Sequence, residues 1–390
     1  MIKNYPIVVF SHLSWDFVYQ RPQHLLSRLA ANRWVIFIEE PTYEANSNPR
    51  WEFTTPAPNV LVCRSFVNAD DEGVGFTDEQ MAVMEPMVKD LLAREEIHDY
   101  VVWMYTPMAL PLAQSLTPKA VVFDIMDELS AFEFAPPVLV EREAELLQWA
   151  DVVFTGGPSL YKAKLGRHAN LHCFPSSVDA SHFAQARTLS EPADQASLPH
   201  PRLGFYGVID ERMDLSILDA MAVAHPEWQI VMVGPILKID PTLLPKHDNL
   251  HFVGGRSYGD LPRYLAGWDV CLLPFALNNS TKFISPTKTL EYMAAGLPIV
   301  STPITDVAEP YGEIVYLGRT PEQFILACEH ALDASEEELT ERRHKANDVL
   351  AHTSWDATAR SMEKLIEAAI RDRTPAVDLS GAGILTNNYV

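Results

Sequence analysis

Short apolar runs alternate with helical patterns along almost the whole chain, and this alternation limits the fold more than any other feature. Runs such as Ile7–Phe10 and Val101–Met104 have the length of strands, whereas Val140–Trp149 shows the apolar spacing of a helix. Strands that alternate with helices indicate parallel sheets covered by helices. A chain of 390 residues is too long for one ordinary core and suits two such units. The predicted fold class is α/β.

The domain boundaries follow from composition. Residues 185–201 are rich in Ala, Ser and Pro and poor in large apolar side chains, so we predict an interdomain linker there. We expect an N-terminal Rossmann-like domain at 1–184 and a second such domain at 202–353. A further helix is expected at 354–373, followed by a small, polar tail at 374–390 that frays. Two doubly wound domains that face each other leave a cleft at the carboxyl ends of both sheets, where ligands of such folds bind.

The predicted secondary structure can be stated by residue range. Strands are expected at Ile7–Phe10, Val35–Ile38, Val101–Met104, Ala120–Phe123, Val152–Thr155, Leu171–Phe174, Leu203–Tyr206, Ile230–Val233, Val270–Leu273, Ile299–Ser301 and Ile314–Leu317. Helices are expected at Pro22–Ala31, Val140–Trp149, Leu215–Ala224, Asp260–Ala266, Pro286–Ala295, Pro321–Leu332, Glu336–Leu350 and Trp355–Arg371.

Charge and cysteine content narrow the classes of partner. The net charge of −22 argues against nucleic acid, because phosphate binding requires a basic surface, and it weakens electrostatic docking on anionic lipid. The four cysteines are far apart and form no Cys-x-x-Cys pair: Cys63, Cys173, Cys271 and Cys328. Buried free thiols in a reducing compartment fit that spacing. No apolar run approaches the roughly 20 residues of a membrane span, and we expect a cytoplasmic protein.

One segment, which begins at Ser285, is the most informative about function. Ser285 suits a helix N-cap, Pro286 the first helical position and Gly296 the C-terminal stop. Lys288 then falls in the first turn, where a cation costs roughly 0.3–1 kcal/mol against the helix dipole. That placement makes sense if the helix N-terminus and Lys288 together bind an anion such as phosphate. Glu291 lies on the same helix face and could accept hydrogen bonds from sugar hydroxyls.

This segment resembles the donor-site helix of family 4 and related glycosyltransferases of the GT-B fold, which carry a Glu, an Ala-rich helix and a Gly-x-Pro-Val-Val pattern. The resemblance extends roughly from Pro6 to Ile370 and is closest to bacterial polysaccharide and teichuronic-acid-type transferases. Those proteins share Arg-Pro-Gln-His near the start and Ser-Pro-Thr-Lys-Thr-Leu-Glu-Tyr near the donor site. The resemblance implies two facing Rossmann-like domains, with the helix that starts near Trp355 crossing back onto the first domain.

The resemblance also implies a set of donor contacts. In the family a cation after the first strand of the second domain contacts the donor diphosphate, and a second cation follows the next strand; Arg212 and Lys238 match them. The alternative for Arg212 is a solvent-exposed ion pair with Asp210 or Asp214. The alternative for Lys238 is a surface lysine without a role in binding. The family's Phe-x-Gly loop reads the nucleobase, and the matching segment 251–258 would let a side chain stack on the base unless Tyr258 faces the core. The implied donor set is Arg212, Lys238, Arg256, Tyr258, Ser285, Thr287, Lys288 and Glu291.

The sequence departs from the family at one point. Many family 4 enzymes carry two Glu separated by seven residues, and Phe283 stands where the first would be, so that only Glu291 remains. The retention of configuration that is usual in the family is therefore in doubt for this chain.

Two loops at strand ends of the first domain are candidates for the acceptor side. The loop after the first strand and the start of the next helix supply His12, Trp15 and Arg21, for which a structural histidine and a core tryptophan are the alternatives. No Gly-x-Gly-x-x-Gly is present, which argues against a dinucleotide oxidoreductase. A second loop supplies Asp124 on the acceptor side and, as candidate catalytic carboxylates, Asp127 and Glu128. The alternative for this second loop is an acidic cluster that caps a helix.

The expected function is transfer of a sugar from a nucleoside-diphosphate donor, with UDP the family's commonest, to a glycan or lipid-linked acceptor. The expected enzyme needs no cofactor, and no metal, because lysine and arginine can neutralise the diphosphate. The other hypotheses are a nucleotide-sugar epimerase of the same fold and a non-catalytic GT-B interaction protein. Peripheral contact with a membrane or assembly protein is compatible with each. The sugar, nucleobase, acceptor, linkage and oligomeric state stay open.

Overall fold

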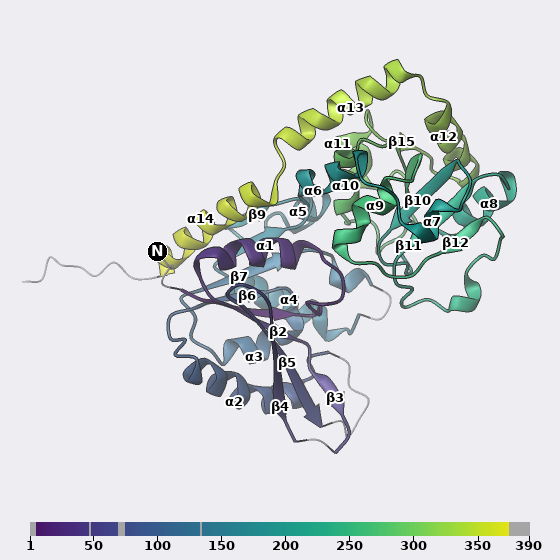
Figure 1. The fold of residues 1–390 in the computed structure, drawn as a ribbon. Coiled ribbons are helices and arrows are strands. Elements are labelled where there is room, and N and C mark those ends of the chain that lie inside the picture. The colour runs from purple at the N-terminus through teal and green to yellow at the C-terminus, as the bar shows by residue number, and fades with distance from the viewer. Residues whose placement is uncertain (1–4, 47, 69–74, 133–134, 374–390) are drawn as a thin grey trace, which may run out of the picture.

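The computed structural model describes residues 5–46, 48–68, 75–132 and 135–373, which form two α/β domains (Figure 1). The predicted tail at 374–390 lies outside the described residues. The N-terminal sheet has the strand order β3-β5-β2-β1-β6-β7-β8-β9, with β4 paired antiparallel to β5 and all other pairs parallel. Its strands are β1 (Ile7–Ser11), β2 (Val35–Glu39), β3 (Thr42–Glu44), β4 (Arg50–Ala57), β5 (Val60–Asn68), β6 (Val101–Met104), β7 (Ala120–Ile125), β8 (Val152–Thr155) and β9 (Leu171–Cys173).

Helices cover both faces of this sheet, because its central strands are apolar on both sides. Val8 and Phe10 of β1 pack into one buried cluster, and Ile7 and Val9 pack into another on the opposite face. This is the pattern of a parallel strand buried on both faces. The helices of the domain are α1 (Arg21–Leu29), α2 (Asp78–Arg94), α3 (Leu110–Gln114), α4 (Val138–Trp149) and α5 (Pro158–Lys164).

The C-terminal domain is a second parallel sheet, with the strand order β12-β11-β10-β13-β14-β15 and one large buried cluster. Its strands are β10 (Arg202–Tyr206), β11 (Gln229–Val233), β12 (Leu250–Phe252), β13 (Val270–Leu273), β14 (Ile299–Ser301) and β15 (Tyr316–Leu317). Its helices are α8 (Leu215–Ala224), α9 (Leu261–Leu265), α10 (Thr287–Ala295), α11 (Thr305–Tyr311), α12 (Pro321–Asp333) and α13 (Glu336–Ala351).

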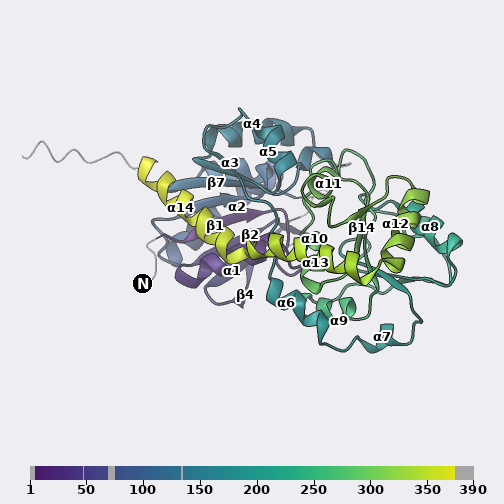
Figure 2. The same cartoon turned by 90° about the horizontal axis from the view of Figure 1, so that it is seen from above.

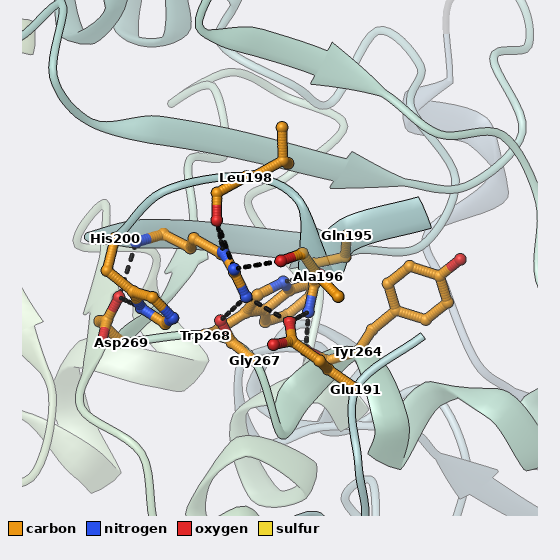
Figure 3. Close-up of polar contacts among 10 residues, drawn as sticks. Glu191, Gln195, Ala196, Leu198, His200, Tyr264, Gly267, Trp268 and Asp269 are labelled. Carbon is orange, nitrogen blue, oxygen red and sulfur yellow. Dashed lines mark hydrogen bonds and ion pairs between the residues drawn. The ribbon is translucent and has the colours of Figure 1, made fainter. Parts of the chain in front are cut away.

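The segment between the domains is folded onto the C-terminal one. It contains α6 (Ala180–Ala184) and α7 (Ala193–Ala196). Buried Arg202 donates hydrogen bonds to the Leu198 and Gly267 carbonyls and pairs with Glu191. The Gln195 side chain accepts from the Trp268 indole at 2.8 Å, and these side chains meet at the start of the second sheet (Figure 3). The predicted linker 185–201 thus lies against the C-terminal domain.

The last helix, α14 (Trp355–Arg373), returns to the N-terminal domain. Figure 2 shows α13 over the C-terminal domain and α14 continuing along the N-terminal sheet. Trp355 and Ile366 are fully buried in the same cluster as Ile7 and Val9, and Asp356 pairs with Arg28 of α1 at 2.5 Å. In the described part of the chain, no helix combines the length and the apolar character needed to cross a membrane.

Some elements were not expected from the sequence. Strand β4 exposes most of its residues and contains Pro56, and helix α2 contains Pro86, so both lack the patterns that would predict them. Strand β5 alternates in burial, and its pairing between β2 and β4 decides its state. The strands and helices that were predicted agree with the structure to within a few residues at their ends.

Candidate active site

A cavity lies between the two domains, at the carboxyl ends of β10 and β11. Its volume of about 470 Å³ is within the usual range of small-molecule sites. Residues 15–20 and Pro56 of the N-terminal domain form one wall, and the C-terminal domain forms the rest. The lining residues of the C-terminal domain are Tyr206, Gly207, Val208, Arg212, Val233, Gly234, Pro235, Arg256, Ser257, Tyr258, Leu261, Thr287, Lys288 and Glu291.

Helix α10 directs Lys288 into this cavity. The helix begins at Thr287 with Pro286 as its N-cap, so the prediction of Ser285 as N-cap was wrong by one position, while Gly296 ends the helix in the left-handed conformation as expected. Gly207, with a φ of 132°, makes room for Lys288, because a Cβ there would overlap the lysine side chain. In the described part of the chain the Lys288 amine has no hydrogen-bonding or ion-pair partner, and its burial lowers its pKa. A bound anion would stabilise the charged amine and so offset the free-energy cost of burying it.

Glu291 lies one turn further along α10 and also faces the cavity. The Tyr206 hydroxyl donates a hydrogen bond of 2.6 Å to Glu291 Oε2, which fixes the orientation of the carboxyl group. Only 6% of Glu291 is exposed, and burial raises its pKa to about 7, partly offset by the Tyr206 hydrogen bond and by the charge of Lys288. The other carboxyl oxygen is the group that can accept from a ligand hydroxyl.

The raised pKa of Glu291 predicts a pH dependence of stability. Folding moves this pKa from 4.5 to about 7. The native carboxyl therefore holds a proton that the unfolded chain has released, so its contribution to stability falls as pH rises from about 4.5 to about 7. In Glu291→Gln this loss is absent, and we expect Tm of the variant minus Tm of the wild type to increase between about pH 5 and 8, measured by thermal denaturation without nucleotide. Glu337→Gln, at an exposed position on α13, is the control; a constant difference for Glu291→Gln would contradict the assignment.

The two other predicted donor cations occupy different parts of the cleft. Arg212 lines the cavity while forming a two-pronged ion pair with Asp210, with its closest contact at 2.6 Å. Arg212 can therefore pair with Asp210 and still contact a diphosphate in the cavity. Lys238, in the left-handed conformation with a φ of 57°, does not line the cavity. Burial lowers the pKa of His12 and raises that of Glu40; the charge of Lys238 adds to the first shift and opposes the second.

The predicted base-stacking residues are occupied by protein contacts. Arg256 donates to the Tyr264 hydroxyl at 2.6 Å and pairs with Asp194 at 2.8 Å. The Tyr258 ring stacks on His182 at a centroid distance of 4.4 Å and lies 4.6 Å from Tyr19. Its contacts with protein rings match the alternative of a core-facing Tyr258. Both Arg256 and Tyr258 still border the cavity, so they shape the end where a base would lie.

The two candidate catalytic carboxylates are separated by their partners. Asp127 is half-buried and is not among the residues that line the cavity; burial raises its pKa, and the nearby charges of Arg212 and Lys288 lower it. Glu128 instead pairs with the buried amine of Lys164 at 2.7 Å and accepts from the Ser130 hydroxyl. The structure brings Asp127 near Arg212 and Lys288 and holds Glu128 within the N-terminal domain.

The acceptor-side candidates divide in the same way. Arg21 and Asp124 are both buried and pair at 2.8 Å, so they join α1 to the end of β7 and satisfy each other. Trp15 borders the cavity, and its ring meets Phe37 edge to face. Burial lowers the pKa of His12 to about 4, and its Nδ1 is buried without a partner among the described residues. His12 is therefore a neutral group with an unused polar atom.

Three residues of the site were missed in the sequence. Tyr206 orients Glu291, and Glu40, whose pKa burial raises to about 7, faces Lys238. The Phe132 ring lies within 6 Å of both the Arg212 guanidinium and the Lys238 amine. Tyr206 and Glu40 follow or end predicted strands, a position that could have suggested them, whereas nothing in the sequence pairs Phe132 with cations of the other domain. Among the described residues, no group of three or more His, Cys, Asp or Glu is placed to hold a metal ion.

Solved structures with the same architecture identify the fold class. An α,α-trehalose-phosphate synthase (UDP-forming) from Burkholderia xenovorans, in complex with glucose-6-phosphate, matches with a TM-score of 0.70 and 12% identity over 93% of this chain and all (100%) of its own. A sucrose-phosphate synthase from Thermosynechococcus elongatus matches with a TM-score of 0.68 and 18% identity over 95% and 100%. A structure from E. coli, described as trehalose-6-phosphate bound with UDP-2-fluoro glucose, matches with a TM-score of 0.67 and 12% identity over 94% of this chain and 99% of its own. The chain has the GT-B fold.

Sequence comparisons agree with that class. Residues 200–334 match the family model described as Glycosyl transferases group 1. A protein named "Putative teichuronic acid biosynthesis glycosyltransferase TuaH", from Bacillus subtilis, is 23% identical over 302 residues, which are 72% of this chain and 75% of the relative. The predicted resemblance to family 4-like glycosyltransferases of the GT-B fold is confirmed.

Proposed function

We propose that this protein transfers a sugar from a UDP-sugar donor to a hydroxyl group of a glycan or lipid-linked acceptor in polysaccharide synthesis. One observation carries the proposal: Lys288, Arg212 and Glu291 converge on a single cavity that the N-terminal domain closes. The family match of residues 200–334 covers all three side chains.

The cations would bind the donor diphosphate. A nucleoside diphosphate needs several positive groups around it, and the half-buried amine of Lys288, the guanidinium of Arg212 and the first N–H groups of α10 supply them. Negative charge accumulates on the leaving diphosphate during transfer, so the same groups favour the transition state. This supply of positive charge supports our proposal that no metal is required. Glu291, oriented by Tyr206, would accept from a sugar hydroxyl.

Asp127 is the proposed acceptor-side carboxylate. It lies near the donor cations of the other domain, where it can orient an acceptor hydroxyl or take its proton. We propose retention of configuration, in which Asp127 positions the acceptor hydroxyl and takes its proton. The replacement of the family's first Glu by Phe283 makes the stereochemical outcome the part most in need of measurement.

UDP is proposed because the relevant solved structures include one bound with UDP-2-fluoro glucose and a UDP-forming synthase. A glycan acceptor is proposed because the Bacillus subtilis relative is named for teichuronic acid biosynthesis. We place the reaction in the cytoplasm, with peripheral contact to membrane or assembly proteins as part of the same proposal.

A panel of UDP-sugars, incubated with and without an acceptor extract and followed by mass spectrometry, tests this function. We expect UDP release that depends on the acceptor, with a new glycosylated product. Conversion of the UDP-sugar to its epimer without acceptor would favour the epimerase hypothesis. No consumption of any donor, together with no stabilisation by UDP, would favour a non-catalytic protein. NMR of the product's anomeric proton decides between retention and inversion.

A further inference from the structure

Apart from the cavity walls, the two domains meet where α5 lies beside α11 (Figure 1). Asp306, in the first turn of α11, is only 4% exposed. Its Oδ1 accepts a hydrogen bond of 3.0 Å from the backbone N–H of Ser159, which belongs to the first turn of α5. A carboxylate of one domain thus caps a helix of the other.

Gly157 makes this contact possible. Its φ of −168° and ψ of 161° are extended values that any residue adopts, so the local backbone does not require glycine. The three atoms nearest to an ideal Cβ at this position all belong to the other domain. They are Oδ2 and Cγ of Asp306 and, at 2.9 Å, the Cβ of Ser285. The missing side chain is therefore required by the contact between the domains.

The same contact reaches the start of helix α10. The Ser285 carbonyl, two residues before the first helical residue, accepts a hydrogen bond of 2.6 Å from the Ser176 hydroxyl of the N-terminal domain. Lys288 follows three residues later. Closing the domains at Gly157 therefore fixes the position of the N-terminal end of α10, which carries Lys288.

The contact is incompletely satisfied, as a reversible one would be. Asp306 Oδ2 and Ser159 Oγ are both buried, and neither has a hydrogen-bond partner within the described ranges. A buried carboxylate is costly, and burial raises the pKa of Asp306 in spite of its contact with Ser159. This cost is recovered when the domains separate and water reaches the carboxylate.

We propose that Gly157 and Asp306 form a closure latch, in which the bare Cα of Gly157 admits the Asp306 carboxylate to the Ser159 N–H and so positions the start of α10 for the nucleotide. Both residues are positioning residues that act through Ser285 and Lys288. The latch deepens the proposed sugar transfer and rests on it only for its purpose, since closure itself is measured without a reaction.

Gly157→Ala tests the latch by placing a methyl group in the contact between the two domains. The added methyl group overlaps Asp306 only when the domains are closed, so we expect an unchanged fold and a larger radius of gyration in small-angle X-ray scattering with UDP present. We expect KM for the UDP-sugar to rise about tenfold, the size of one lost charge-assisted hydrogen bond, with a smaller change in kcat. A radius of gyration and a KM equal to those of the wild type would overturn the proposal.

Matched variants separate the hydrogen bond from a general effect on the interface. Asp306→Asn keeps an acceptor for the Ser159 N–H and should resemble the wild type, whereas Asp306→Ala should resemble Gly157→Ala. Lys162→Ala breaks the exposed ion pair with Glu309 (2.9 Å) at the same interface and should change nothing, because such pairs contribute little. Equal behaviour of the two Asp306 variants would overturn the latch. If the wild type transfers no sugar, the scattering comparison still decides whether the latch exists.

Discussion

Lys288→Ala is expected to weaken UDP binding by at least about tenfold and to reduce kcat/KM for the UDP-sugar by more than that. The amine is half-buried in the cavity at the start of α10 and has no ionic partner in the described part of the chain. A charge-assisted hydrogen bond to phosphate contributes about 1.5–3 kcal/mol, and this contribution grows as charge accumulates on the leaving diphosphate. Thermal shift and calorimetric titration with UDP measure the binding, and initial rates with the UDP-sugar measure kcat/KM.

A neighbouring lysine provides the control. Lys282 is exposed and outside the cavity lining, so Lys282→Ala removes the same charge from the same region without removing the phosphate contact. We expect UDP to stabilise Lys282→Ala as much as the wild type. Equal stabilisation of Lys288→Ala would remove this lysine from the donor site. Because the variant also removes a buried charge that lacks a partner, its Tm without UDP should not fall.

Asp127→Asn should reduce transfer by roughly 10²–10⁴-fold, the range for loss of a positioned acid or base, while UDP affinity changes little. The carboxylate lies close enough to Arg212 and Lys288 for their charges to lower its pKa, so it is placed beside the proposed donor site. Asn has the same size but cannot take a proton. Initial rates with saturating donor measure the effect, and calorimetric titration with UDP measures the affinity.

The adjacent carboxylate makes this prediction specific. Glu128 pairs with buried Lys164, so Glu128→Gln should lower Tm and leave the transfer rate of the folded protein near that of the wild type. Unchanged transfer in Asp127→Asn would reject its catalytic role. A loss of transfer in Glu128→Gln with an unchanged Tm would move that role to Glu128.

Much of the fold could be predicted because its signals are local. The strands at Val101–Met104, Val152–Thr155 and Val270–Leu273 have the predicted bounds, since a strand buried on both faces is a nearly continuous apolar run. Strand β4 could not be predicted, because its exposed residues carry no period and its state depends on pairing with β5. Helix α10 was found through Gly296, but its N-terminus was displaced by one residue, because Pro286 rather than Ser285 takes the capping position.

The candidate functional residues of the cleft could also be predicted from local sequence, but the residues that they contact could not. Lys288 stands out because a cation near a helix N-terminus is unfavourable unless an anion binds there, and Glu291 follows on the same helix face. That Glu128 pairs with Lys164, and that Tyr258 stacks on His182, depends on segments far away in the sequence.

The amino-acid sequence alone determined two parallel α/β domains and marked the start of α10 as a candidate anion site, because periodicity, capping and the helix dipole act over a few neighbouring residues. Only the tertiary structure decided which candidates reach the cavity and how the domains touch. The contact of Gly157 with Asp306 joins positions 149 residues apart through an extended backbone that any residue could adopt. No local propensity marks such a glycine, because the atoms that exclude a side chain there belong to the other domain.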